Sequence, residues 1–120
     1  MPMARIMIVD DNFSIRLLIS ALITDAGHEV VLQATNGQEA LNAYFNTKPD
    51  LLIVDYQMPV MDGISLIKEI KKDDSAVKVL LCTGSIDVLE NDGLTKDIAV
   101  LSKPFDNNEL LGLVTAALEN

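Results

Sequence analysis

Two kinds of segment alternate along the chain, and their order predicts the fold. Some are short runs built almost entirely of Ile, Leu, Val and Met, which are typical of strands buried on both faces of a parallel sheet. The three clearest runs are Arg5 to Val9, Leu51 to Val54 and Val77 to Cys82. We predict two further strands, at Glu29 to Ala34, where apolar and polar residues alternate, and at the short segment Ala99 to Leu101.

The segments between these strands carry the three- and four-residue spacing of amphipathic helices. In the first such segment this apolar stripe should hold the helix against the sheet, and Gly27 follows as a helix stop. Its residues are Phe13, Leu17, Leu18, Ala21 and Leu22. The stretch from Thr35 to Gln38 resembles a capping box, which predicts a second helix running to about Asn46.

Three more helices are predicted after the third, fourth and fifth strands. Apolar residues at Ile64, Leu66, Ile67 and Ile70 mark one of them, and the weakly patterned segment from Ser85 to Asp97 is assigned another. Asp106 followed by Glu109 forms a capping-box-like start for the last helix, which should end near Leu118.

Five repeats of strand and helix predict an α/β fold with one parallel sheet and helices on both faces. The alternating second strand and the short fifth strand suit the two edges, which gives the order 2-1-3-4-5 of flavodoxin-like, doubly wound folds. The length of 120 residues predicts a single domain over residues 1–120.

The charge balance removes several classes of function. Nine Lys or Arg stand against eighteen Asp or Glu, and a formal net charge of −9 opposes direct binding to nucleic acid. One cysteine, Cys82, excludes an internal disulfide framework, and one histidine, His28, removes most zinc sites. We expect Cys82 to be an inert core residue and His28 to be structural or exposed. No long apolar segment or basic leader is present, so we expect a cytoplasmic protein without membrane contact.

The candidate chemistry follows the ends of the predicted strands. Asp10 and Asp11 end the first strand and Asp55 ends the third, and these two strands are neighbours about 5 Å apart in the predicted sheet. Three carboxylates this close repel one another unless a cation joins them. A cluster of oxygen ligands without His or Cys favours Mg²⁺ over zinc.

A carboxylate in such a cluster can act as a nucleophile toward phosphorus, because phosphoryl transfer needs mainly positioning and charge neutralisation. Lys103, after the fifth strand, has the reach to pair with one phosphoryl oxygen. Thr83, at the end of the fourth strand, can donate a hydroxyl hydrogen bond to another. The residues by themselves therefore indicate magnesium-dependent phosphoryl chemistry.

An ordered set of motifs runs through the whole chain: Val9-Asp10-Asp11, Val54-Asp55-Tyr-Gln-Met-Pro59 with Met61-Asp62-Gly63, Thr83-Gly84, and Lys103-Pro104-Phe105. This set resembles the receiver domain of two-component response regulators. The resemblance implies that Asp55 is the phosphoacceptor and that Thr83 and Lys103 contact the phosphoryl group. It also implies that Asp11, Asp55 and the Gln57 carbonyl bind Mg²⁺ directly, that Asp10 holds it through water, and that the Lys103–Pro104 peptide bond is cis.

The resemblance implies a phosphorylation-activated signalling switch. It would accept a phosphoryl group from a histidine kinase, a phosphotransfer protein or a small donor, catalyse only its own phosphorylation and dephosphorylation, and signal by contact with a downstream protein. Two features depart from many receivers: Val100 stands where an aromatic switch residue is common, and residues 85–97 lack an Ala-rich pattern. We therefore expect the signal to pass through Thr83 and the segment Gly84 to Asp92.

Two alternatives use the same residues differently. A small Mg²⁺-dependent phosphohydrolase also has an Asp nucleophile, but such enzymes usually carry a D-x-D arrangement after the first strand, whereas this chain has adjacent Asp10 and Asp11. A binding module with a vestigial site is the other alternative, and it is disfavoured because all the expected site positions are filled.

Overall fold

The computed structural model describes residues 3–84 and 98–119. In these ranges five strands and four helices follow one another in the predicted order. The strands are β1 (Arg5–Val9), β2 (Glu29–Ala34), β3 (Leu51–Asp55), β4 (Val79–Thr83) and β5 (Ala99–Ser102). The helices are α1 (Phe13–Asp25), α2 (Gly37–Thr47), α3 (Gly63–Lys71) and α4 (Asn107–Glu119). The helix predicted at Ser85 to Asp97 and most of the segment Gly84 to Asp92 lie outside the described residues.

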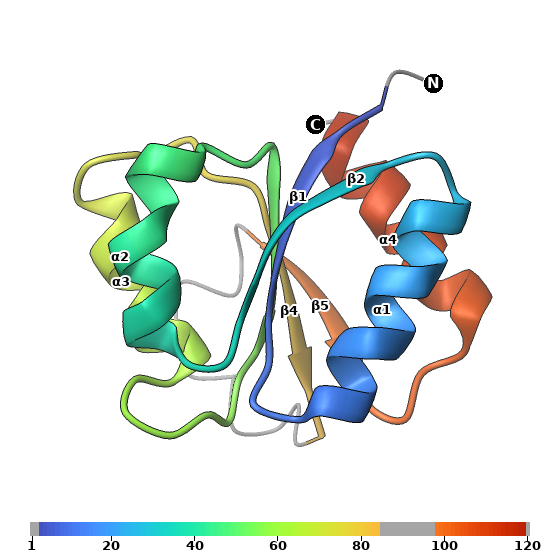
Figure 1. Ribbon diagram of the computed structural model, residues 1–120, viewed down its shortest axis with the longest axis horizontal. Coiled ribbons are helices and arrows are strands. Elements are labelled where there is room, and N and C mark those ends of the chain that lie inside the picture. The colour runs from blue at the N-terminus through green and yellow to red at the C-terminus, as the bar shows by residue number, and fades with distance from the viewer. Residues whose placement is uncertain (1–2, 85–97, 120) are drawn as a thin grey trace.

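The five strands form one parallel sheet in the order β2-β1-β3-β4-β5, as predicted. Figure 1 shows α2 and α3 on one side of this sheet and α1 and α4 on the other. All five strands run in the same direction, so their carboxyl ends meet at one edge, the lower one in Figure 1. We call this the carboxyl edge of the sheet.

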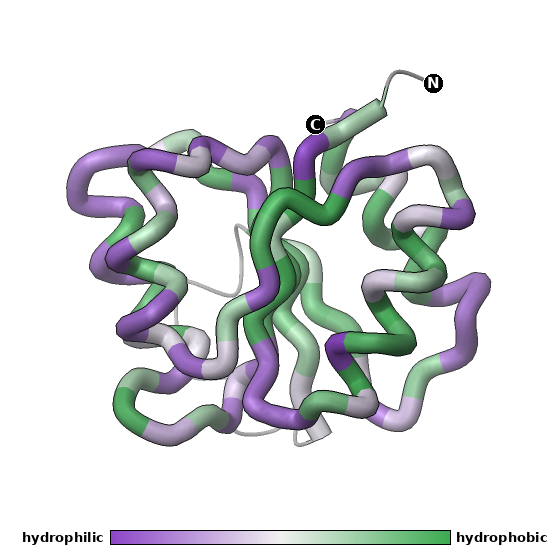
Figure 2. Tube along the Cα trace, in the orientation of Figure 1, coloured by the Kyte–Doolittle hydropathy of each residue, from purple (hydrophilic) through white to green (hydrophobic). Residues whose placement is uncertain are grey.

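Each face of the sheet carries its own hydrophobic core. β3 and β4 are buried along their whole length, and their side chains alternate between the two cores. Figure 2 shows the hydrophobic strands in the centre and hydrophilic residues gathered on the outer parts of the helices. Burial on both faces accounts for the continuous apolar runs in the sequence, because neither face of these strands meets water.

The first helix presents a different face to the sheet from the one predicted. Ile19 and Ile23 are its buried residues, whereas Phe13 and Leu17 are 66% and 57% exposed. Leu18 is also exposed. Leu22 is the member of the predicted stripe that packs against the core. The rest of the stripe is wrong, and α1 leaves large apolar side chains on the surface close to the carboxyl edge.

The backbone at the helix ends confirms the predicted stop after α1 and the predicted start of α4, and it corrects the predicted start of α2. Gly27 has a φ of +95°, which suits a stop after α1. At α4, the Glu109 amide donates to Asp106 and the Asp106 amide donates to Glu109, as in a capping box. At α2 the box is shifted by one residue: the Glu39 amide donates to the Asn36 side chain, and the Thr35 amide donates to the Glu39 carboxylate.

The fourth strand begins later than the apolar run suggests. The prediction placed the start of this strand at Val77. Instead, the Ala76 amide donates to the Asp74 side chain and the Val77 amide donates to the Asp74 carbonyl, which forms a turn. Pairing with β3 begins only at Val79. Within the described residues, none of the helices has both the length and the apolar composition to span a membrane.

Candidate functional site

Strand pairing brings the polar ends of β1, β3, β4 and β5 to the carboxyl edge. Val9 pairs with Val54, so Asp10 and Asp55 follow side by side on neighbouring strands. Thr83 pairs with Ser102, and the Lys103 amide donates to the Thr83 carbonyl at 2.7 Å. The predicted site residues of four different strands thus meet at one place.

Three carboxylates and one ammonium group form the centre of this site. Asp10, Asp11 and Asp55 each offer an oxygen atom, and these oxygens lie within 4.8 Å of one another. The Lys103 ammonium nitrogen lies 3.1 Å from Asp55 Oδ1 and 3.3 Å from Asp10 Oδ2. Asp10 is 2% exposed and Asp55 is 9% exposed, whereas Asp11 is open to solvent.

The pKa shifts of Asp55 and Lys103 reflect both burial and the charges around them. Burial raises the pKa of the Asp55 carboxyl; the hydrogen bond from Lys103 lowers it only in part, and the charges of Asp10 and Asp11 raise it further. Burial alone would lower the pKa of Lys103, but its hydrogen bond to Asp55 and the attraction of both carboxylates outweigh burial and raise it. Lys103 therefore stays protonated, and one ammonium group is shared by carboxylates that together carry more charge than it does.

Asp10 is fixed in place from several sides. Its Oδ1 accepts a hydrogen bond from the Asn12 amide at 2.8 Å, and its Oδ2 faces Lys103. The guanidinium group of Arg16 donates to the Asp10 carbonyl at 2.6 Å. Its Cζ atom lies over the Phe13 ring, 5.6 Å from the ring centroid. The sequence prediction missed Arg16. The available signal was its position on α1, six residues after Asp10, where a long basic side chain can fold back over the start of the helix.

The loop between β3 and α3, residues 56–62, borders the site on one side. Gln57 and Asp11 line the same open hollow of about 430 Å³, so the structure brings the predicted Gln57 close to the carboxylate cluster. Asp62, which also lines the hollow, uses its side chain to accept the Ser65 amide at 2.8 Å and so caps α3. Its capping role agrees with leaving it out of the predicted ligand set.

The other predicted residues divide between the carboxyl edge and the core. Thr83 is 1% exposed and ends β4 at the edge, whereas Val100 is partly buried and packs against the core under α2 and α3. The Lys103–Pro104 peptide bond is cis, as predicted. Cys82 is buried among apolar residues, and this burial raises the pKa of its thiol to about 12, in keeping with an inert core residue.

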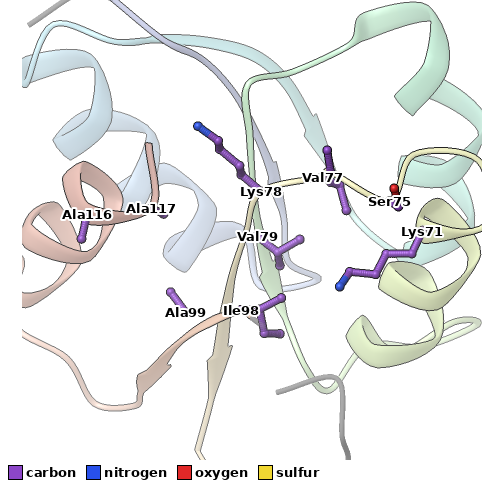
Figure 3. A pocket seen from close by; sticks show the side chains of 10 residues that line it. Lys71, Ser75, Val77, Lys78, Val79, Ile98, Ala99, Ala116 and Ala117 are labelled. Carbon is purple, nitrogen blue, oxygen red and sulfur yellow. The ribbon is translucent and has the colours of Figure 1, made fainter. Parts of the chain in front are cut away.

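A second hollow lies at the opposite edge of the sheet, near the amino ends of β4 and β5 (Figure 3). Aliphatic side chains line most of it, together with Ser75, Lys71 and Lys78. Figure 3 shows the two amino groups well apart, and that of Lys78 donates to the Leu118 carbonyl at 3.0 Å. Among the described residues, none that lines this hollow carries a carboxylate.

The carboxylate cluster fits a hard divalent cation. Its donors are oxygen atoms, they converge, and their negative charge exceeds what Lys103 neutralises. Mg²⁺ binds such sites through one or two carboxylates and keeps several waters, which requires an open side. The exposed Asp11 and the neighbouring hollow provide that open side.

Comparisons with known proteins agree with this geometry. Residues 6–115 match the family model described as the response regulator receiver domain. The chain is 36% identical over 120 residues to chemotaxis protein CheY of Bacillus subtilis, covering 95% of this chain and 97% of that protein. It is 33% identical to sporulation initiation phosphotransferase F of the same organism, covering 88% and 86% of the two chains. Among solved structures, a CheX–CheY–BeF₃–Mg²⁺ complex from Borrelia burgdorferi matches with a TM-score of 0.84, 29% identity and coverage of 97% and 89%.

Proposed function

The chain belongs to the response regulator receiver family, and from this premise we propose that Asp55 is the residue on which it accepts a phosphoryl group. Receiver domains of this type are signalling proteins that interact with histidine kinases and phosphotransfer proteins, and the chain is a phosphorylation-activated switch of a two-component system. The observation that carries the assignment of Asp55 is its place at the end of the central strand β3, between Asp10 and Lys103.

The arrangement around Asp55 suits attack on phosphorus. One Asp55 oxygen forms the new bond to phosphorus, while the electron pair of the broken bond leaves with the donor, which is the imidazole nitrogen when the donor is phosphohistidine. Lys103 already lies 3.1 Å from Asp55, so its ammonium group can move onto a phosphoryl oxygen over a short distance. We propose that Thr83, the residue after Cys82, which pairs with Asp55, donates its hydroxyl to another phosphoryl oxygen.

We assign Mg²⁺ as the cation of the site, with Asp11, Asp55 and the Gln57 carbonyl as direct ligands and Asp10 as a ligand through water. When bound, the ion neutralises the charge of the carboxylates and of the incoming phosphoryl oxygens. The related Borrelia structure contains Mg²⁺ and BeF₃. The hydrogen bonds of Asp10 support this division, because both its oxygens already face donors, whereas Asp11 is exposed beside the hollow.

This division of roles predicts unequal effects at the two neighbouring aspartates. Asp10→Ala should weaken Mg²⁺ binding by about tenfold, as is usual for a group outside the first ligand shell. Asp11→Ala should weaken it more than that, because a direct carboxylate ligand is lost. A magnesium titration followed by amide chemical shifts measures both dissociation constants. Equal losses, or a larger loss in Asp10→Ala, would contradict the assignment of Asp11 as the direct ligand.

The exposed face of α1 is the proposed docking surface for the phosphodonor protein. A donor must reach Asp55 over the carboxyl edge, where α1 begins, and Phe13 and Leu17 expose apolar surface there. A groove of about 360 Å³, lined by Ile15, Leu18 and Phe105 among others, continues this surface up to Lys103. An exposed apolar patch next to a reactive group is typical of a protein contact site.

Removing the Phe13 ring should therefore affect phosphorylation by a protein donor and by a small phosphodonor differently. Phe13→Ala is expected to slow phosphotransfer from a phosphorylated histidine kinase or phosphotransfer protein by about tenfold. Phosphorylation by a small phosphodonor should stay near the wild-type rate, because Arg16 keeps its hydrogen bond to the Asp10 carbonyl without the ring. The matched control is Phe45→Ala, which removes an exposed ring from α2 on the other face of the sheet. Equal rates for Phe13→Ala and wild type with the protein donor would rule out this docking surface.

The phosphohydrolase alternative is not favoured, because the nucleophile candidate lies on β3 and the acidic pair after β1 is adjacent. We propose that the protein works in the cytoplasm, catalyses only its own phosphorylation and dephosphorylation, and passes its state to a downstream protein by contact. Incubation with a small phosphodonor and Mg²⁺, followed by intact mass measurement, tests the phosphoacceptor activity directly.

A further inference from the structure

We propose that Gly37, the first residue of α2, is a positioning residue for the phosphorylation site: it seats the loop of residues 56–62 through a close contact with Met61. This inference rests on the proposed role of the loop, which carries the Gln57 carbonyl. Gly37 lies in α2, whereas the residues of the carboxylate cluster lie at or just after the ends of β1 and β3. Nothing in its own chemistry would bind a metal or a phosphoryl group, so its contribution must come from geometry.

The contact leaves no room for a side chain at position 37. A Cβ atom there would lie 2.6 Å from the Met61 carbonyl oxygen, 2.8 Å from Met61 Cβ and 2.9 Å from Met61 Cγ. Real Cβ atoms do not approach other atoms this closely. Two of the three opposing atoms are the backbone oxygen and Cβ of Met61, so the conflict cannot be relieved by rotating the end of a flexible side chain.

The helix that carries Gly37 is firmly held, so it cannot easily move away. The Asn36 side chain caps α2, and Ala40 and Tyr44 are buried in the core. At the other end of the helix, the Tyr44 hydroxyl donates to Asp74 at 2.9 Å, which ties α2 to the segment after α3. A side chain added at position 37 would therefore displace the loop rather than the helix.

The loop itself has little freedom to absorb such a displacement. Val60, the residue before Met61, has a φ of +71°, which is a strained conformation for a β-branched residue. The Met61 amide donates to the Pro59 carbonyl at 2.8 Å, which makes the turn around Val60 tight. Movement of Met61 would therefore be passed back along the loop toward Gln57.

The end of the loop that leads into α3 is fixed against β3, the strand that carries Asp55. The Gly63 amide donates to the Tyr56 carbonyl at 2.9 Å, and a Cβ at position 63 would lie 2.6 Å from the Asp55 carbonyl oxygen. The loop is thus held between Gly63 at Asp55 and Gly37 at Met61. Gly37 is the one of the two that lies outside the loop and its flanking residues, so it can be changed without touching Asp55.

The test compares Gly37→Ala with Gly112→Ala. Gly112 lies in α4, and a Cβ there meets nothing within 4 Å, so this control makes the same chemical change without a clash. Gly37→Ala should weaken Mg²⁺ binding by about tenfold, the size of effect seen when residues that support metal ligands are altered. Gly112→Ala should bind Mg²⁺ like wild type. In the metal-free protein, the amide chemical shifts of residues 56–62 should change in Gly37→Ala and stay unchanged in Gly112→Ala.

A change in stability alone would not produce these results, because a less stable but folded protein keeps its dissociation constant. If Gly37→Ala does not fold, Met61→Ala serves instead: it removes the Cγ that packs against Gly37 and should also weaken Mg²⁺ binding several-fold. Wild-type affinity in Gly37→Ala, or in Met61→Ala if that variant is needed, would overturn the inference. Absence of Mg²⁺ binding in the wild type would instead overturn the proposed metal site.

Discussion

Replacing Asp55 with Asn is expected to abolish phosphorylation while the fold remains intact. The amide has nearly the same shape as the carboxylate, but it lacks the charged oxygen that would attack phosphorus. The neighbours of Asp55 should stay in place, because Lys103 also pairs with Asp10 and the strand pairing of β3 depends on the backbone. The measurement is the intact mass of the protein after incubation with a small phosphodonor and Mg²⁺, in which the phosphate adduct should be missing.

Asp50→Asn is the matched control for this variant. Asp50 precedes β3 at the opposite edge of the sheet, where its carboxylate accepts the Arg5 amide at 2.8 Å, so Asp50→Asn should keep the adduct. An adduct of unchanged yield in Asp55→Asn would mean that another residue is the acceptor.

The stability of Asp55→Asn provides the check on its fold. Burial raises the pKa of Asp55 in the folded state, so the folded protein holds this proton more tightly than the unfolded chain does. The resulting stabilisation is fully present at pH values below the ordinary pKa of an aspartate. That contribution is lost as the pH rises through the raised, folded-state pKa. Near neutral pH the charged carboxylate is therefore a cost, and Asn, which resembles the protonated form, should unfold at an equal or higher urea concentration than wild type without Mg²⁺.

Lys103→Met should slow phosphorylation by about a hundredfold, the usual effect of removing one group that stabilises the charge of a transition state. The same change should strengthen Mg²⁺ binding, because Asp10 and Asp55 lose the ammonium group that competes for their charge. These opposite effects distinguish Lys103 from the metal ligands, because loss of a metal ligand would weaken Mg²⁺ binding and slow phosphorylation. Phosphorylation rates with a small donor at saturating Mg²⁺, together with a magnesium titration, measure the two quantities.

Lys72→Met serves as the control for Lys103→Met. Lys72 is an exposed lysine that pairs with Glu69 on the surface of α3, so the variant removes the same charge away from the carboxyl edge. It should leave the phosphorylation rate unchanged. A wild-type rate in Lys103→Met would show that the ammonium group plays no part in the transfer.

Most of the site was predictable because its carboxylates, Thr83 and Lys103 lie at or just after the ends of strands that the sequence marks clearly. Asp10, Asp55 and Lys103 come immediately after, or end, apolar runs, and the parallel direction of the strands brings all such ends to one edge. Once the strand order was inferred from the pattern of the edge strands, the closeness of Asp10 and Asp55 followed without knowledge of any side-chain contact.

The orientation of α1 could not be predicted in the same way. Its sequence contains two apolar stripes, Phe13 with Leu17 and Ile15 with Ile19 and Ile23, and both fit the helical period. A helix that is apolar on several sides gives no preferred face, so its docking depends on the sheet it meets. The structure buries Ile19 and Ile23, and this choice leaves the surface that we assign to the phosphodonor protein.

The shifted cap of α2 and the contact at Gly37 show two other limits of sequence reasoning. Thr35 with Gln38 and Asn36 with Glu39 both fit the capping pattern, but a charged Glu near a helix start is favoured by the helix dipole. Gly37 meets Met61, which lies in a distant part of the chain. A contact of this kind depends on how α2 packs against the loop before α3, and local sequence patterns do not report it.

The central claim is that Asp55 carries the phosphoryl group, and chemical trapping tests it most directly. Borohydride reduces an acyl phosphate to a primary alcohol, which would convert a phosphorylated aspartate to homoserine. After phosphorylation of the wild-type protein, reduction and peptide mapping by mass spectrometry, we expect homoserine at position 55. Homoserine at position 10 or 11, or a stable phosphate that resists reduction, would contradict the account.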